Sequence, residues 1–142
     1  MAFIEDPLVH EVIGCAIAVH RELGPGLLES AYNRCFRLEL AHRKIRFSNE
    51  VWLPIQYRGI SLDNAYRMDL MVEDWLIVEV KAIEKVLPVH RAQLLTYIRL
   101  SRARHGLLFN FNEPRLKDGI HSVILGGSVS SPSTTPSTVE NP

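Results

Sequence analysis

The chain has 142 residues, of which 46% are hydrophobic and 23% charged, and its 16 basic and 16 acidic side chains balance to a formal net charge of zero. This composition is typical of one ordinary globular domain. It excludes a protein that holds nucleic acid through a general excess of positive charge, although basic segments at 42–46 and 99–105 leave room for local patches.

Two helices are expected at the start of the chain. Asp6-Pro7 has the form of an N-cap followed by proline at the first helical position, and apolar residues then recur at helical spacing over 7–22. Gly24-Pro25-Gly26 interrupts this pattern, which resumes over 27–44. The second helix begins at Gly26, where we expect a positive φ or a close chain approach, with simple helix punctuation as the alternative.

Alternating patterns after residue 45 predict a series of strands. Apolar residues alternate over 51–57, and Arg58-Gly59 marks a turn before a short strand at 60–62. Pro54 favours an edge position for the first of these strands because it cannot donate a backbone hydrogen bond. Alternation returns over 66–72, which predicts a further strand.

The second half of the chain completes a mixed sheet. Residues 76–80 form a short apolar run that is typical of a buried central strand. A helical period follows over 89–100, and two closing strands are expected at 106–111 and 120–125. The order α-α-β-β-β-β-α-β-β predicts a mixed α/β or α+β sheet without internal repeats.

The end of the chain differs from the rest in composition. Residues 127–142 are almost entirely Ser, Thr, Pro, Val and Gly, with Glu140 as the one acid and no base. Such a segment cannot bury enough apolar surface to offset the cost of ordering the chain. We therefore expect a folded domain over 1–126 and a disordered tail over 127–142.

The sequence indicates a cytoplasmic protein without a membrane anchor. Its longest apolar run, 12–19, is far shorter than the roughly 20 residues that a membrane span requires, and acids precede it where a leader would carry bases. Cys15 and Cys35 lie within helical patterns and lack CxxC spacing, which indicates reduced core residues.

Two charged residues occur where a core strand should be apolar. Glu79 and Lys81 are two residues apart in or beside the run 76–80, so their side chains share one face of the strand. Burying such charges costs several kcal/mol unless a partner charge or a metal ion compensates. A salt bridge at the solvated end of the strand is the structural alternative to a functional site.

The position of a third charged residue, Asp69, depends on how two strands are joined. Asp69 precedes Glu79 by ten residues, so an antiparallel hairpin sets them opposite each other only if the connection has an odd length, most simply 73–75. A two-residue connection, Glu73-Asp74, would instead pair Asp69 with Val78 and separate the two acids. The sequence leaves both registers open.

If the acids meet, their chemistry points to a hard cation. Asp69 and Glu79 on one sheet face would repel each other unless a cation bridged them, and carboxylate ligands suit Mg²⁺ or Mn²⁺. Lys81 beside them could hold a water or a phosphate oxygen and stabilise charge that develops in a transition state.

The segments Arg67-Met68-Asp69 and Glu79-Val80-Lys81 resemble the signature of the PD-(D/E)XK nuclease superfamily, with Met68 at a place where proline is common. The resemblance implies a restriction-endonuclease-like α/β fold, a mixed sheet flanked by helices. It also implies that Asp69, Glu79 and the Val80 carbonyl hold Mg²⁺ or Mn²⁺, and that Lys81 assists attack on a phosphodiester.

A second motif lies upstream. Gly26-Leu27-Leu28-Glu29-Ser30-Ala31-Tyr32 matches the pattern that names the GxxExxY family, a small branch of that superfamily. The segments 19–26, 93–97 and 110–111 are also similar, and the resemblance covers roughly 7–125. Arg91 and the pair Asn64-Ala65 depart from the family's usual pattern, which concerns substrate details more than the metal centre.

The resemblance assigns roles to five further residues, each with a structural alternative. Glu29 lies at the border of an apolar helix face and would reach the metal site, or else be a first-turn acid favoured by the helix dipole. Gln93 and Tyr97 are four apart on one helical face and resemble a motif near the active site of RecB-like nucleases, with Tyr97 alternatively a core aromatic. His20 would bind metal or phosphate, or serve the fold. Arg67 would balance the acids or contact phosphate.

These assignments predict a metal-dependent nuclease that hydrolyses phosphodiester bonds of nucleic acid, DNA in preference to RNA, with Lys81, Glu29 and Gln93 as its catalytic residues. A small domain of this kind could need a homodimer or a protein partner to enclose a duplex. The alternative is a non-catalytic module that binds nucleic acid or protein on the same scaffold. Retention of costly buried charges favours the enzyme.

Overall fold

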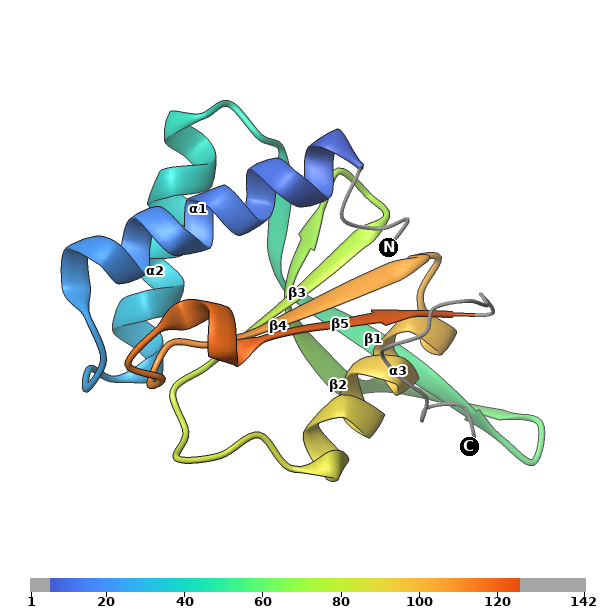
Figure 1. The fold of residues 1–142 in the computed structure, drawn as a ribbon. Coiled ribbons are helices and arrows are strands. Elements are labelled where there is room, and N and C mark those ends of the chain that lie inside the picture. Colours follow the sequence, from blue (N-terminus) through green and yellow to red (C-terminus); the bar gives the residue numbers. More distant parts are fainter. Residues whose placement is uncertain (1–5, 126–142) are drawn as a thin grey trace.

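A five-stranded sheet forms the centre of the molecule, with helices on both faces (Figure 1). The computed structural model describes residues 6–125, so the predicted tail at 127–142 lies outside the described residues. Its elements are α1 (Pro7–Leu23), α2 (Glu29–His42), β1 (Phe47–Tyr57), β2 (Ile60–Val72), β3 (Leu76–Lys81), α3 (Pro88–Leu100), β4 (His105–Asn110), the 3-10 helix η2 (Leu116–Gly119) and β5 (Ile120–Ile124).

The sheet has the order β1-β2-β3-β4-β5. Its central pair, β3 and β4, is parallel, and all other neighbours are antiparallel. This α+β arrangement is consistent with the predicted restriction-endonuclease-like mixed sheet flanked by helices. The expected edge position of Pro54 is confirmed because β1 is an edge strand.

Helix α1 begins where the N-cap pattern predicts. The Asp6 side chain accepts hydrogen bonds from the backbone N–H groups of Leu8 (2.8 Å) and Val9 (3.3 Å). These contacts satisfy two donors that have no partner within the helix. Cys15 lies fully buried on this helix with a free thiol, as predicted for a core cysteine, and burial raises its pKa to about 11.

The turn between α1 and α2 is fastened by a tyrosine of the second helix. The Tyr32 hydroxyl donates to the Gly24 carbonyl and accepts from the Leu27 backbone N–H (3.1 Å). Gly26 has φ of 98°, which confirms the expected positive value. A Cβ atom added there would meet no heavy atom within 4 Å, so the backbone conformation, and not a lack of space, requires glycine.

Helix α2 is therefore shorter than the predicted range 27–44. Leu28, the residue before Glu29, has an extended backbone with ψ of 149°, and Gly26 has φ of 98°, so the chain before Glu29 does not have helical conformation. At the other end the helix stops at His42, and Lys44 has φ of 60°, outside the helical region.

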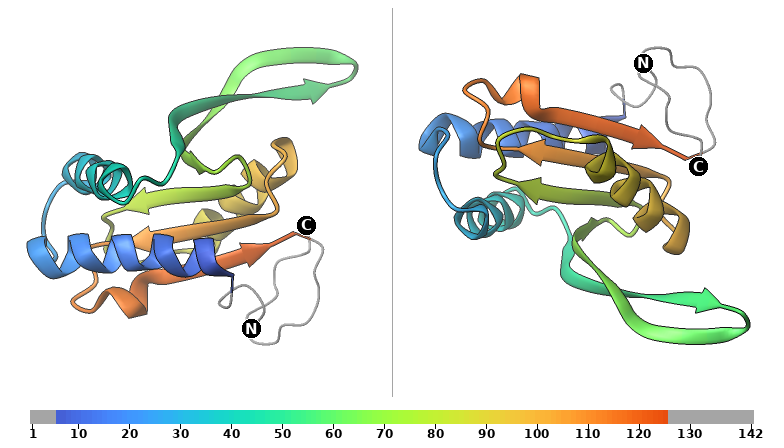
Figure 2. Two further views of the ribbon diagram at one scale, coloured as in Figure 1. Left: turned by 90° about the horizontal axis from the view of Figure 1, so that it is seen from above. Right: turned by 90° about the horizontal axis from the view of Figure 1, so that it is seen from below.

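The predicted strands at 60–62 and 66–72 are one continuous strand, β2, so three strands and not four lie between α2 and α3. The register shifts within the β1–β2 pair: Ile55 faces Leu62, whereas Leu53 faces Tyr66. Residues 63–65 thus bulge opposite a proline that has no N–H to offer the ladder, and the strand continues beyond them. The outer part of this hairpin extends away from the rest of the sheet (Figure 2).

Two hydrophobic clusters lie on opposite faces of the sheet. Helices α1 and α2 cover one face and α3 covers the other, as Figure 2 shows. On the second face, a Cβ atom at Gly106 would lie 2.7 Å from Leu94 Cδ1, so glycine allows α3 to pack directly on the backbone of β4. The prediction that 76–80 is a buried central strand is confirmed, since all five residues are buried.

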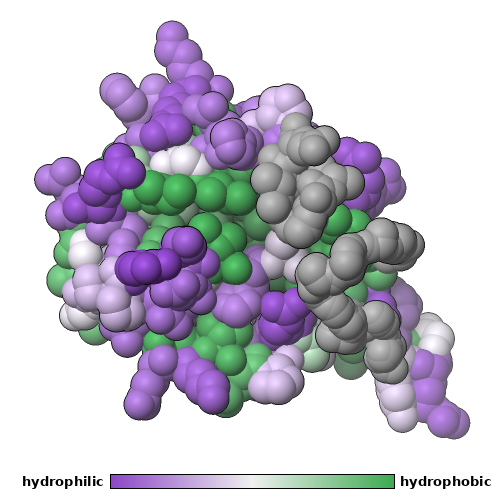
Figure 3. Space-filling model, in the orientation of Figure 1, coloured by the Kyte–Doolittle hydropathy of each residue, from purple (hydrophilic) through white to green (hydrophobic). Residues whose placement is uncertain are grey.

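The outer side of α1 keeps some apolar surface. Leu8, Ile13 and Ile17 are only partly buried, and Figure 3 shows hydrophobic surface along this helix between hydrophilic side chains. Within residues 6–125, no helix combines the length and apolar character needed to cross a membrane.

Candidate active site

Asp69 and Glu79 meet at the point where β2 and β3 separate. The strands pair from Val72 opposite Leu76 to Leu70 opposite Val78, so the connection between them is the three-residue one. Continuing this register sets Asp69 opposite Glu79. The structure therefore has the register that brings the two acids together.

Each acid then binds the backbone of the opposite strand. The Asp69 N–H donates to Glu79 Oε2 (3.0 Å), and the Val80 N–H donates to Asp69 Oδ2 (2.9 Å). These contacts take the place of the next ladder bonds and hold both side chains in fixed orientations.

A twist in the β1–β2 pair explains why a polar residue is tolerated at this point. Leu70 and Val72 pack in the cluster under α1 and α2, whereas Met68 packs in the cluster under α3. The strand thus exchanges its inward face at Asp69. Opposite this exchange, Glu50 on β1 has φ of 55°, so both strands are distorted at the same level.

The site carries more negative charge than its surroundings compensate. Burial raises the pKa of Glu79 to about 8, with a further increase from the charge of Asp69 and an opposing effect of Lys81. Burial also raises the pKa of Asp69, which a hydrogen bond from Val80 and the charges of Lys81 and Arg67 lower in part. The buried Glu79, the half-buried Asp69 and one lysine therefore leave room for a further positive charge.

Glu29 belongs to this cluster. Glu29 is exposed to solvent, and partial burial of its carboxyl group raises its pKa, which the charge of Lys81 and the backbone of Ala82 lower and the charge of Asp69 raises further. It is the first residue of α2, and the Tyr32 contacts described above set where that helix starts. The structure thus brings Glu29 to Asp69, Glu79 and Lys81, as the sequence-based hypothesis requires.

Lys81 is the last residue of β3, at the point where the parallel pair of β3 and β4 ends. Its carbonyl accepts a hydrogen bond from the Phe111 N–H (2.8 Å), and its side chain is half-buried. Asn110, its partner in the register with β4, is fully buried and bonds both the N–H (3.0 Å) and the C=O (3.0 Å) of Ile83. Asn110 thereby holds the chain that leaves the strand just after Lys81.

Tyr97 reaches the same region from α3. Its side chain is buried, and burial raises the pKa of its hydroxyl to about 12, with the charges of Glu79 and Asp69 adding to the effect. Its ring meets that of Tyr66 edge-on, with centroids 6.1 Å apart. Gln93, one helical turn earlier, is exposed to solvent.

Arg67 and His20 occupy different surroundings. Arg67 is half exposed, and its Nη1 lies 3.9 Å from Glu50 Oε2. Its charge lowers the pKa of Asp69, so it helps to balance the acids.

His20 is buried against Phe111, and its Nε2 lies 2.8 Å from the Glu113 carbonyl oxygen. These contacts give His20 a role in holding the loop after β4, which matches the structural alternative stated for it.

A family model described as the PD-(D/E)XK nuclease superfamily matches residues 6–123. The chain belongs to the PD-(D/E)XK nuclease superfamily. No curated protein and no solved structure matches it. The match spans the segments that carry Glu29, Asp69, Glu79 and Lys81, so the superfamily domain and the charged cluster coincide.

Nucleases of this superfamily generally depend on divalent metal ions. Across residues 6–125, no three His, Cys, Asp or Glu side chains are grouped so as to hold a metal ion by themselves. The donor set nevertheless fits a hard cation, because Asp69 and Glu79 bring two carboxylates together where the strands separate, each held by a backbone N–H of the opposite strand. A third ligand would have to come from the backbone or from water.

Two residues that complete the site were not assigned a role from the sequence. Asn110 was noted only as part of the family's pattern, and its position as a polar residue at the end of an apolar run is the signal that could have marked it. Tyr66 carries no comparable signal, because its contact with Tyr97 joins residues from a strand and a helix far apart in the chain.

Proposed function

We propose that this protein is a nuclease of the GxxExxY branch that hydrolyses phosphodiester bonds of nucleic acid, DNA in preference to RNA, with Mg²⁺ or Mn²⁺. The observation that supports the proposal is the cluster of Glu29, Asp69, Glu79 and Lys81, drawn from one helix and two strands. The literal motif from Gly26 to Tyr32 supports the assignment to the branch.

The proposed metal ligands are the carboxylates of Asp69 and Glu79 and the carbonyl oxygen of Val80. When bound, the ion would neutralise phosphate charge and favour formation of a hydroxide nucleophile. Asp69 and Glu79 are held ready for this role by the backbone amides that they accept from, so little reorganisation is needed.

The chain's own groups supply the remaining chemistry. The Lys81 ammonium would orient the attacking water by hydrogen bonding and stabilise the charge that develops on the phosphate oxygens. Glu29 would hold a water on the opposite side of the site. Gln93 and Tyr97, on the adjoining face of α3, would contact the strand beside the scissile bond.

The test is cleavage of labelled single- and double-stranded DNA and RNA with Mg²⁺, Mn²⁺ or EDTA. Cleavage that requires metal, is lost in Lys81→Ala and is kept in Lys85→Ala would support the proposal. Lys85 is a suitable control because it is an exposed lysine four residues further along the chain. Running the assay at two protein concentrations tests whether cleavage requires a homodimer, the alternative to a protein partner.

Two observations favour the second candidate function, a non-catalytic binding module. The chain is electrically neutral, and its described part contains no ready-made group of three metal-binding side chains. Absence of cleavage with every substrate and metal would favour the non-catalytic module that binds nucleic acid or protein.

A further inference from the structure

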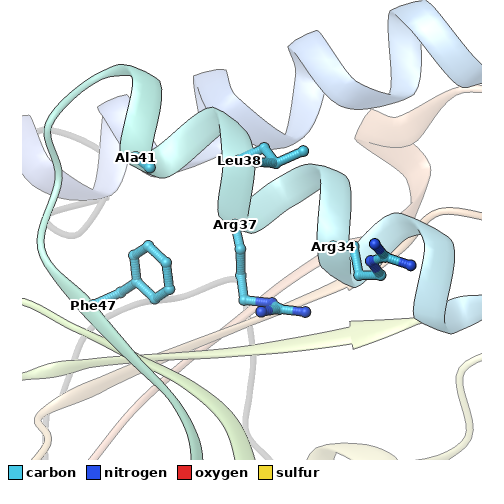
Figure 4. A pocket seen from close by; sticks show the side chains of 5 residues that line it. All are labelled: Arg34, Arg37, Leu38, Ala41 and Phe47. Atoms are coloured by element: carbon cyan, nitrogen blue, oxygen red, sulfur yellow. The ribbon is translucent and has the colours of Figure 1, made fainter.

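We propose that a cavity between α2 and β1 binds one nucleotide of the strand to be cleaved, an inference that rests on the proposed function. The cavity has a volume of about 340 Å³ and lies between α2 and the start of β1 (Figure 4). Its lining consists of two arginines and three apolar side chains: Arg34, Arg37, Leu38, Ala41 and Phe47.

The two arginines keep their charge available. Among the described residues, no carboxylate forms an ion pair with Arg34 or Arg37, whereas Arg43 and Arg46 are each paired with two acids. The basic segment 42–46, which the sequence suggested as a local patch, is thus largely neutralised within the protein. The available positive charge lies one to two turns earlier, on α2.

The arginine nearer to β1 is oriented for binding. Arg37 Nε donates to Asn33 Oδ1 (2.8 Å), one turn earlier on the same helix, which restrains the guanidinium group. Figure 4 shows Arg37 beside the ring of Phe47, with Arg34 further along the helix. A planar guanidinium matches the geometry of phosphate oxygens, so this arrangement suits a phosphodiester.

The remaining lining suits the rest of a nucleotide. Of the apolar lining residues, Leu38 is 70% exposed and Phe47 is half-buried. An aromatic ring next to a positively charged groove is the usual arrangement for binding unpaired bases, because every base offers a face on which to stack. The volume is at the small end of ligand sites and agrees with one nucleotide.

A short segment of one nucleic-acid strand is long enough to reach from the cavity to the acids. Arg34 and Arg37 follow Glu29 by five and eight residues, about 8 and 12 Å along the helix axis. Phe47 pairs with Val72, which is three residues, about 10 Å, from Asp69 along β2. These separations correspond to two or three nucleotides at about 3.4 Å of rise each. We therefore assign the cavity to a single-stranded or locally unpaired segment next to the scissile bond.

The experiment measures binding without cleavage. Fluorescence anisotropy with a labelled oligothymidylate in EDTA would compare the wild-type chain with the double variant Arg34→Gln/Arg37→Gln. We expect binding to weaken about tenfold or more, and the slope of log K against log salt to fall in magnitude by about 1.4, because each lost contact with a single strand removes about 0.7. Phe47→Leu should weaken binding while leaving the salt slope unchanged.

The matched control is Arg21→Gln/Arg58→Gln, which removes two exposed arginines, one on α1 and one in the turn between β1 and β2, and should bind as the wild-type chain does. Wild-type affinity and slope in the cavity variant, or no binding by the wild-type chain, would overturn the inference. The outcome is separable from that of the proposed function: arginine-dependent binding without cleavage in Mg²⁺ or Mn²⁺ would support the cavity and refute the nuclease. Metal-dependent cleavage by the wild-type chain, together with unchanged binding in the double variant, would support the nuclease and refute the cavity.

Discussion

Replacing Glu79 by glutamine should stabilise the metal-free protein, although it removes a proposed metal ligand. Burial and the neighbouring Asp69 raise the pKa of Glu79 from 4.5 to about 8. When folding raises the pKa of a carboxyl group, the protein is most stable at a pH at which the group is protonated in both states, here below 4.5. The free energy of unfolding then falls as the pH rises toward 8. At neutral pH the wild-type protein therefore carries a cost that the variant avoids.

The size of this cost follows from the shift in pKa. One pKa unit corresponds to about 1.4 kcal/mol, so the raised pKa of Glu79 lowers the free energy of unfolding by about 1 kcal/mol at pH 5, about 3 kcal/mol at pH 7 and about 4 kcal/mol at pH 8, because the unfolded chain ionises this group more readily. Glutamine carries no charge at these pH values, and its amide oxygen can still accept the bond from the Asp69 N–H. The gain in free energy of unfolding should approach these figures.

Urea unfolding in EDTA at pH 5, 7 and 8 measures the difference between Glu79→Gln and the wild-type chain. Comparison at each pH cancels the effect of other titrating groups, and Glu84→Gln, a change at an exposed glutamate, is the matched control. Mg²⁺ should raise the stability of the wild-type chain and leave the variant unchanged. A variant that is less stable than the wild type at pH 8, or an advantage that does not grow with pH, would refute the reasoning.

Two further predictions concern supports of the site, and a third concerns His105, at the opposite end of β4 from Asn110. Tyr32→Phe should lower the free energy of unfolding by about 1–3 kcal/mol, because the Gly24 carbonyl and the Leu27 N–H lose their partner. An unchanged midpoint of thermal unfolding would contradict this. Asn110→Ala should cost about 2–4 kcal/mol in denaturant unfolding, since the backbone groups of Ile83 are left without partners; a neutral effect would show that water replaces the amide. Burial lowers the pKa of His105 to about 4, so its contribution to stability is lost as the pH falls from 6.5 through 4; an imidazole titration near 6.5 by NMR would disprove the assignment.

The types of most elements could be predicted from the sequence because they depend on neighbouring residues. Asp6-Pro7 marks the start of α1 through a cap that forms within three residues. The run 76–80 is apolar on both faces, which marks it as central before any partner strand is known. The motif from Gly26 to Tyr32 and the pair of segments around Asp69 and Glu79 sufficed to identify the superfamily.

The boundaries that failed depend on contacts across the chain. The start of helix α2 was placed too early because Leu28 has an extended backbone, in a turn that the Tyr32 hydroxyl braces through Gly24 and Leu27. Strand β2 was divided in two because Asn64 and its neighbours have loop-forming character, and only pairing with β1 carries the strand past them. Local preference was overridden in both cases by a partner outside the local window.

The sequence by itself determined which residues could do chemistry: two acids ten residues apart, a lysine two residues further on, and an acid at the start of a helix. The tertiary structure alone decided that they meet, by selecting the three-residue connection over the two-residue one and by bringing Glu29 to the strands. It also decided which arginines keep a free charge, since pairing with distant acids neutralises Arg43 and Arg46 and leaves Arg34 and Arg37 facing a cavity. Residue types and spacing are local properties, whereas register, burial and charge pairing arise from packing between segments that are far apart in the chain.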